Sequence, residues 1–237
     1  MKRIYFSETI KIIGAMVILF TPMIKAVGGE SNGVAIVKKA YNDVQKETLD
    51  GKTEKAQIST PLFSEDKLKT GRKAFALVKF TEDNSIIRMR EQAVLTIKSG
   101  GLRNSTMKEA FLEKGGIGFD VSKQRNNQQF QLTSPTSVAS IRGTKGKWCR
   151  GEHSDTLILI EGKVLLRNRL SNNEVEIEGG FIGFSNDDGT IEKRGATDGE
   201  LADAVRFAST DESSRQIKIE MKDPKGTKKT LKLDYKE

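Results

Sequence analysis

Short segments in which apolar and polar residues alternate recur along most of the chain. A spacing of two between apolar positions is typical of strands that bury one face. We predict strands at residues 34–37, 74–80, 85–89, 93–97, 118–121, 129–132, 157–160, 163–166, 175–177 and 180–184. The pattern indicates an all-β protein made of short strands.

Turn-forming residues separate several of these strands. Segments 82–85, 161–163, 171–173 and 187–189 contain Asn, Asp or Gly, which tolerate the left-handed backbone conformation of tight turns. Neighbouring strands are therefore expected to pair as antiparallel hairpins. We predict an antiparallel sandwich or jelly-roll-like fold, with a β-solenoid-like stack as the alternative architecture.

Two regions depart from the alternating pattern of short strands. The polar segment 104–110 lies between predicted strands and is expected to be a surface insertion with a short helical turn. Near the carboxyl end, segment 198–208 has apolar residues at the i, i+3, i+4, i+7 spacing of a short amphipathic helix, at Leu201, Ala204, Val205 and Ala208.

The last residues predict a β-hairpin. Segments 216–222 and 229–235 alternate with period two around Asp223-Pro-Lys-Gly226, which favours a type I turn. One face of this hairpin would be apolar, with Ile217, Ile219, Met221, Leu231, Leu233 and Tyr235. A lone hairpin is marginally stable in water, so we expect the rest of the chain, or else a partner, to cover this face. The lysines between 225 and 232 lack interleaved aromatics, which favours a solvated hairpin face over a nucleic-acid site.

One connection between strands stands out for its composition. It runs Ser134-Pro-Thr-Ser-Val-Ala-Ser-Ile-Arg-Gly-Thr144, and its proline breaks an extended stretch into two strands because proline fixes its own φ and restricts the preceding residue. Gly143 gives the backbone freedom where Arg142 leaves the second strand. We expect Arg142 to anchor a turn by binding backbone carbonyls or a carboxylate.

This connection resembles the T-P-x-x-x-A-x-V-R-G-T signature of the FecR domain, the periplasmic domain of the bacterial iron-dicitrate sensor. Three more segments are similar to elements of that family, in the same order along the chain. Residues 61–71 resemble its D-x-L-x-T-G element, residues 76–88 its strand, turn and strand, and residues 157–164 its V-x-E-G-x-V element. The resemblance covers roughly residues 34–186 and implies a non-catalytic envelope domain.

The first residues predict export. Lys2, Arg3 and Lys11 precede an apolar run from Ile12 to Ile24, which is too short to span a membrane, since spanning needs about 20 residues. Small residues follow, so we predict a signal peptide at residues 1–28, cleaved after Ala26 or Gly28, with an uncleaved anchor as the alternative. We expect no sigma-factor-binding domain before the run, in contrast to what the resemblance implies for membrane-bound sensors of the family. We expect a β-domain at residues 29–195 and a helix-plus-hairpin extension at residues 196–237.

Charge and cysteine content narrow the compartment and the partners. The net charge of +8 falls to +5 without the leader, because residues 1–28 hold four lysines or arginines and one glutamate. The mature chain is therefore only mildly basic, and with its predicted export it is not expected to bind nucleic acid. A single cysteine, Cys149, allows no internal disulfide, so burial must stabilise the fold. We expect a periplasmic, secreted or cell-envelope location.

Candidate catalytic chemistry is sparse. His153 is the only histidine and is expected to lie on the surface, because no serine in a strand-to-helix elbow accompanies it. Cys149 is expected to be half-buried beside a packing tryptophan rather than an activated thiol. The glycines of segment 115–118 do not have the dinucleotide-binding pattern. We predict no catalytic residue, no metal site and no cofactor.

The candidate interaction residues are those of the signature and the segment after it: Pro135, Arg142, Gly143, Thr144, Lys147 and Trp148. Lys147 and Trp148, on a strand predicted to be exposed, would suit an acidic glycan or an envelope protein. The favoured function is a non-catalytic binding protein of the envelope, as a signalling accessory. A scaffold component of a cell-surface assembly is the alternative, and a secreted hydrolase is the least favoured.

Overall fold

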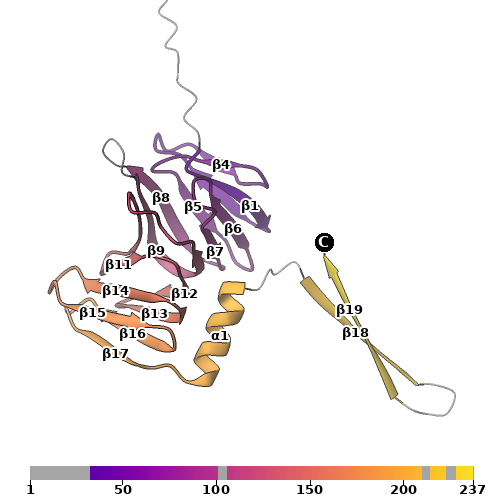
Figure 1. Ribbon diagram of the computed structural model, residues 1–237. Helices are drawn as coiled ribbons and strands as arrows, with labels where there is room; N and C mark the ends of the chain where they lie inside the picture. The colour runs from indigo at the N-terminus through magenta and orange to yellow at the C-terminus, as the bar shows by residue number, and fades with distance from the viewer. Residues whose placement is uncertain (1–32, 101–105, 210–213, 223–227, 237) are drawn as a thin grey trace, which may run out of the picture. The chain divides into compact units, whose positions relative to one another are not determined.

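The chain divides into two units, Met1–Ser31 and Asn32–Glu237. The computed structural model describes residues 33–100 and 106–209 of the second unit, together with the backbone of residues 214–222 and 228–236 (Figure 1). The predicted leader at residues 1–28 lies outside the described residues.

The first 17 strands form one hydrogen-bonded sheet that folds into two layers. The first layer runs in the order β4 (Pro61–Leu62), β1 (Ala35–Tyr41), β6 (Phe75–Phe80), β7 (Ile86–Met89), the carboxyl half of β9 (Thr106–Val121), β12 (Thr144–Arg150), β13 (Ser154–Glu161), β16 (Phe181–Asn186) and β17 (Ile191–Gly195). The second runs in the order β3 (Thr53–Lys55), β2 (Val44–Glu47), β5 (Lys67–Thr70), β8 (Val94–Gly100), the amino half of β9, β10 (Gln128–Thr133), β11 (Ser137–Ile141), β14 (Lys163–Asn168) and β15 (Glu174–Glu178). The structure confirms the predicted all-β sandwich.

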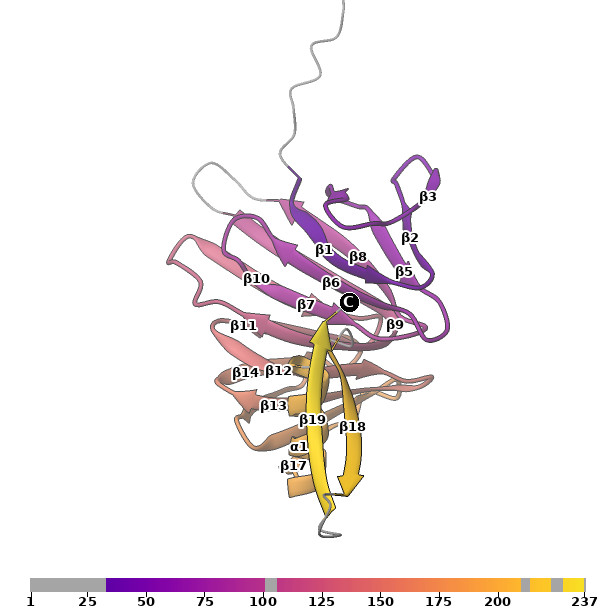
Figure 2. The ribbon, with the colours of Figure 1, turned by 90° about the vertical axis from the view of Figure 1, so that its right-hand side faces the viewer.

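The core lies between the two layers. The rings of Phe80 in β6 and Phe130 in β10 meet edge to face with centroids 4.9 Å apart, so the layers pack directly on one another. Trp148, Phe75 and Phe119 are among the largest fully buried side chains. Beyond β9, successive hairpins belong to the two layers in turn: β10–β11 and β14–β15 to the second layer, β12–β13 and β16–β17 to the first. In each layer these strands therefore follow one another in chain order (Figure 2).

Strand β9 joins the layers because it changes partners halfway along its length. Its amino half pairs with β8, and its carboxyl half pairs with β7 and β12. The change falls at Gly115, whose φ is +88° and where an added Cβ would lie 2.6 Å from Cα of Ala93. Only glycine allows this close approach in the left-handed conformation.

The predictions for the region around β9 were partly wrong. The described part of the polar segment 104–110, from Thr106 onward, belongs to β9 and is neither an insertion nor a helical turn. Strand β10 also pairs in parallel with the amino half of β9, because the chain returns to the same end of that strand before β10 begins. The other predicted strands are all present, and the four predicted turns contain left-handed residues at Asn84, Gly162, Asn172 and Gly189.

The predicted helix is α1 (Asp198–Ser209), which packs on the first layer. A capping box starts it, since Glu200 N–H donates to Thr197 Oγ1 at 3.3 Å and Thr197 N–H donates to Glu200 Oε2 at 2.9 Å. Ala204 and Ala208 are buried, whereas Val205 is exposed, so the predicted apolar stripe was wrong at that position. No helix in residues 33–100 and 106–209 is long and apolar enough to cross a membrane.

The predicted terminal hairpin is also present in the backbone. Strands β18 (Ser214–Lys222) and β19 (Lys228–Lys236) pair antiparallel, with Ile217 opposite Leu233 and Ile219 opposite Leu231. The apolar positions of the two strands are therefore paired with one another. The expected turn at residues 223–226 lies outside the described residues.

Candidate functional site

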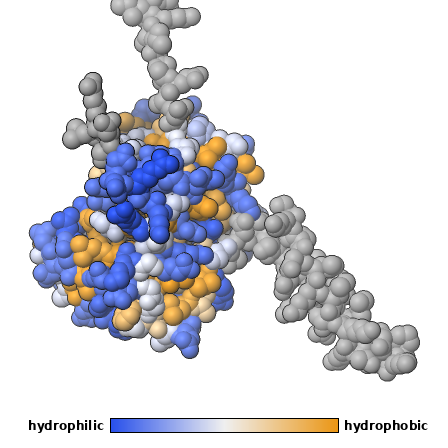
Figure 3. Space-filling model, in the orientation of Figure 1, coloured by the Kyte–Doolittle hydropathy of each residue, from blue (hydrophilic) through white to orange (hydrophobic). Residues whose placement is uncertain are grey.

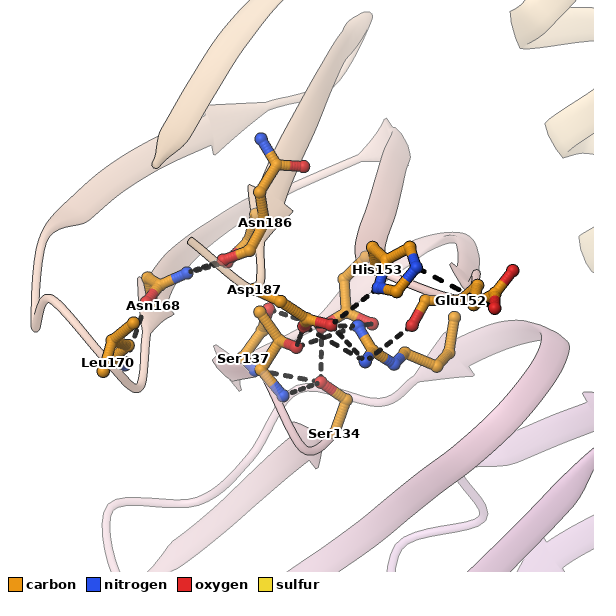
Figure 4. A network of polar contacts seen from close by, with 12 residues as sticks. Ser134, Ser137, Glu152, His153, Asn168, Leu170, Asn186 and Asp187 are labelled. Carbon is orange, nitrogen blue, oxygen red and sulfur yellow. Dashed lines mark hydrogen bonds and ion pairs between the residues drawn. The ribbon is translucent and has the colours of Figure 1, made fainter. Parts of the chain in front are cut away.

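A buried polar network organises the turn between β10 and β11 (Figure 4). Ser134 Oγ accepts hydrogen bonds from the backbone N–H groups of Thr136 and Ser137, at 3.0 and 2.9 Å. The same hydroxyl donates to Oδ2 of Asp155 in β13, and Ser137 Oγ donates to that oxygen at 2.6 Å. Because β10 and β11 belong to one layer and β13 to the other, the network ties the two layers together.

Asp155 is a buried carboxylate, and burial raises its pKa because the charged form loses hydration. Hydrogen bonds from Ser134 and Ser137 and the charge of Arg150, 3.8 Å away, oppose this rise in pKa. Arg150 also donates to Thr136 Oγ1 at 2.8 Å and to Asp187 Oδ1 at 3.1 Å. The guanidinium therefore links the buried carboxylate to an exposed one.

The network has the composition of a hydrolytic site but not the arrangement of one. Both serine hydroxyls are fully buried and donate to Asp155, so neither is oriented as a nucleophile by an imidazole. The side chain of His153 is 81% exposed, with Nδ1 3.7 Å from Asp187 Oδ2, as expected for a surface histidine. Within residues 33–100 and 106–209, no group of three or more His, Cys, Asp or Glu side chains could hold a metal ion. The geometry is that of a structural anchor.

Two of the six predicted interaction residues belong to the interior. Trp148 is fully buried and Thr144 is 2% exposed. This burial confirms the packing tryptophan expected beside Cys149, and the expectation that Trp148 lies on an exposed strand and contacts a ligand was wrong. Strand β12 is central in its layer, between β9 and β13, which explains the burial. Pro135 is exposed at the tip of the turn.

Arg142 and Gly143 lie at the end of β11. The exposed Arg142 donates to Oδ1 of Asn126 at 3.3 Å, which is a side-chain amide and not the backbone carbonyl or carboxylate that we expected. Gly143 has a φ of +71°, in agreement with its expected role, and an added Cβ would lie 2.9 Å from Cγ of Lys123. The glycine therefore permits both the turn and the passage of the neighbouring loop.

Lys147 belongs to a different environment, the contact between β12 and α1. Its Nζ lies 2.6 Å from Oδ2 of Asp203 and 4.6 Å from the ring centre of Phe207. On the same side, an added Cβ at Gly118 would lie 2.5 Å from the carbonyl oxygen of Phe207. This glycine lets the helix approach the sheet, which accounts for part of the glycine cluster at 115–118.

Cys149 lies beside this contact and is half-buried, as predicted. Burial raises the pKa of its thiol, and nearby Lys147 only partly opposes the effect. A raised pKa keeps the thiol protonated, which is the opposite of an activated cysteine.

A polar groove of about 460 Å³ lies on the outer face of β10 and β11. Gln129 and Gln131 of β10 alternate with buried Phe130, and Ser140 of β11 lies directly opposite Gln131. Residues 124–126 form part of its wall, and Arg142 lies at its end. Among the predicted site residues, Arg142 alone lines this groove.

The surface elsewhere offers less organised features. Hydrophilic residues cover most of the face shown in Figure 3, with smaller hydrophobic clusters between them. Among residues 33–100 and 106–209, the exposed large hydrophobic side chains come from separate parts of the chain: Tyr41, Leu49, Ile58, Leu165, Leu170 and Val205. Scattered residues of this kind are normal for a protein surface.

Sequence reasoning missed Asp155 and Gln124, the polar residues on which the network and the groove depend. For Asp155 a signal was present, because it shares its strand face with buried Leu157 and Leu159. An acidic residue at an inward position of a strand indicates a buried carboxylate with partners. Gln124 lies in a loop, where periodicity gives no such signal.

Three comparisons with known proteins were made, and the match to a family model agrees with the resemblance seen in the sequence. Two crystal structures of a proposed anti-sigma factor from Parabacteroides distasonis are similar over 57% of this chain and 62% of theirs, with 12% identity and TM-scores of 0.49 and 0.48. This chain thus matches less than two thirds of those proteins. No curated protein sequence matches it. The model of the family described as FecR protein matches residues 66–165, from the residue before β5 into β14, so this part of the chain is a FecR domain.

Proposed function

We propose that this chain is a non-catalytic, exported protein of the bacterial cell envelope that binds a protein or an envelope ligand, as an accessory in signalling. The FecR domain at residues 66–165 supports a regulatory role. The polar network around Asp155 supports the non-catalytic part of the proposal, because its hydroxyls and its carboxylate bind one another.

The groove over β10 and β11 is the observation that carries the proposal. Its polar side chains point away from the core on two strands of the FecR domain, and Arg142 of the signature segment lies at its end. Recognition surfaces are commonly positioned in this way, as exposed polar groups on a rigid sheet. A ligand bound here would contact the signature segment directly.

The test is site-specific crosslinking in intact envelopes. A photoreactive amino acid replaces the exposed Ser140, which lies in the groove, and in a matched control it replaces the exposed Ser171, in the turn between β14 and β15. We expect an adduct, identified by mass spectrometry, from position 140 and none from position 171. Equal labelling at both positions would contradict a binding role for the groove. A stoichiometric complex that forms without labelling at position 140 would favour the scaffold alternative.

Export has its own test. The apolar run that ends at Ile24 is short and followed by small residues, so the protein isolated from cells should begin at Val27 or Gly29. N-terminal sequencing measures this directly. A protein that begins at Met1 and resists extraction with alkaline carbonate would be an anchored protein, contrary to the proposal.

A further inference from the structure

We propose that the groove over β10 and β11 binds an acidic saccharide, a ligand that combines hydroxyl groups with a carboxylate. The inference rests on the proposed function, since it names the ligand class of the same site. It follows from the chemistry of the lining side chains, from one buried acceptor without a donor, and from the pairing of the two strands.

The lining is rich in amides. Gln124, Asn126, Gln128, Gln129 and Gln131 contribute to it, and a primary amide offers both donors and an acceptor in one rigid plane. Sugar hydroxyls also donate and accept, so amides match them better than side chains that only donate or only accept. Ser140, opposite Gln131, adds a hydroxyl.

Gln124, one of the residues that line the groove, has a buried acceptor without a partner. This residue is 4% exposed, and its Nε2 donates to Asp83 Oδ2 at 2.6 Å and to the carbonyl oxygen of Ser122 at 2.9 Å. Because both of these partners are acceptors, the amide cannot be turned round. Its Oε1 is buried without a hydrogen-bond partner in the described structure. A buried acceptor without a donor is unfavourable, and a ligand hydroxyl would satisfy it once the wall of the groove opens at Gln124 on binding.

The amide of Gln124 is held in place by an ion pair beneath it. Asp83, which accepts its hydrogen bond, also pairs with Lys108 at 2.5 Å, and the Lys108 side chain is 1% exposed. Nearby Glu82 accepts a hydrogen bond from Gln128 at 2.8 Å. These contacts fix two of the lining amides before any ligand arrives, and preorganisation of this kind favours binding.

Two arginines give the groove its charge preference. Arg125 and Arg142 line it, both are exposed, and none of the described lining residues is a carboxylate. A guanidinium binds a carboxylate through two parallel hydrogen bonds. The lining aromatic, Phe130, is 1% exposed and offers no face for a neutral sugar to stack on. The attraction between the two arginines and a carboxylate therefore has to supply the affinity that ring stacking supplies in other sugar-binding sites.

The strand pairing argues against a peptide in the same groove. β10 is hydrogen-bonded to β9 and β11, and β11 is hydrogen-bonded to β10 and β14, so neither strand has a free edge. Extended peptides commonly bind by adding a strand to such an edge. A ligand bound over β10 and β11 would therefore contact side chains and could not pair with the backbone as an added strand.

The test compares trigalacturonic acid with its methyl ester, which is the same saccharide without the charge. Calorimetric titration of the mature full-length chain should show binding of the acid, at least tenfold weaker binding of the ester, and weaker binding of the acid at high salt. Arg142→Gln should weaken binding of the acid about tenfold, whereas Arg72→Gln, which removes an exposed arginine outside the groove, should not change it. Gln124→Leu removes the unused acceptor and should also weaken binding; circular dichroism checks that each variant is folded.

Equal binding of acid and ester, no binding at millimolar concentrations, or an unchanged affinity in Arg142→Gln would each overturn the inference. An acidic peptide that binds where the saccharide does not, with loss in Arg142→Gln, would replace the saccharide by a peptide. If crosslinking from position 140 still succeeds while the saccharide fails to bind, the ligand class is wrong and the proposed function stands. If both experiments fail, both are wrong.

Discussion

Replacing Ser134 by alanine should lower the free energy of unfolding far more than the removal of an exposed hydroxyl would. The hydroxyl of Ser134 makes three hydrogen bonds in a fully buried position: it accepts from the N–H groups of Thr136 and Ser137 and donates to Asp155. Alanine fits the same space without strain, so the effect isolates these bonds. The perturbation therefore tests whether the signature turn is a structural anchor.

The magnitude follows from what the substitution leaves unpaired. Two backbone N–H groups lose this acceptor and a buried carboxylate loses a donor, and each loss of this kind costs roughly 1–3 kcal/mol. Taking the low end for each, because water can reach part of a turn, gives about 3 kcal/mol in the free energy of unfolding. For a chain of this size that corresponds to a fall in melting temperature of roughly 6–12 °C.

The effect should also depend on pH in a defined direction. Burial raises the pKa of Asp155 in the folded protein, and loss of the Ser134 donor raises it further. A carboxyl with a raised folded pKa takes stability away as the pH rises through that pKa, because the folded state then holds the charged form at a cost. The difference between the variant and the wild type should therefore be larger at about pH 8 than at about pH 4.

Thermal and urea denaturation of three variants provides the assay. Ser134→Thr keeps the hydroxyl, as the family signature has it, and should recover most of the stability. Ser140→Ala removes an exposed hydroxyl on β11 and should stay within about 0.5 kcal/mol of the wild type. If Ser134→Ala has the same melting temperature as Ser140→Ala at both about pH 4 and about pH 8, the network does not anchor the turn and the reasoning is refuted.

Three further predictions concern other parts of the fold. Gly143→Val places a β-branched residue at a φ of +71° and should lower stability by about 2 kcal/mol or more, whereas Gly195→Val, with open space around it, should not; an unchanged melt with lost partner binding would instead assign Gly143 to recognition. The hydrogen bond from Arg194 lowers the pKa of Glu200 to about 2, so the contribution of Glu200 to stability is present above the unfolded pKa of 4.5 and is lost as the pH falls toward 2. In Glu200→Gln the melting temperature should therefore change less with pH over that range than in the wild type, and equal acid sensitivity in both proteins would contradict this. Truncation after Ser209 removes the hairpin and should destabilise the remainder and promote aggregation if its apolar face packs on the chain itself; a truncated protein with an unchanged melt that has lost a partner in pull-downs would show that the partner covers it.

The sequence by itself determined the local structure. Period-two alternation gave the strands, because the backbone of a strand places alternate residues on opposite faces whatever their partners. Asn and Gly at the turns, and Thr197 with Glu200 at the start of α1, act through hydrogen bonds and backbone conformations within a few residues. The FecR signature was readable for the same reason, since its proline and glycine impose their conformations locally.

The tertiary structure alone decided which polar residues matter and where. The pairing partners of β9 change at Gly115, and this change makes β9 both the neighbour of β10 in one layer and the neighbour of β12 in the other. As a result Trp148 lies in the core. The groove needs β10, β11 and the loop at Gln124 together, and the anchor needs Asp155 from the opposite layer. Such contacts join residues far apart in the chain, and which of them form depends on how whole strands pair and bury their faces, a choice that no short segment of sequence contains.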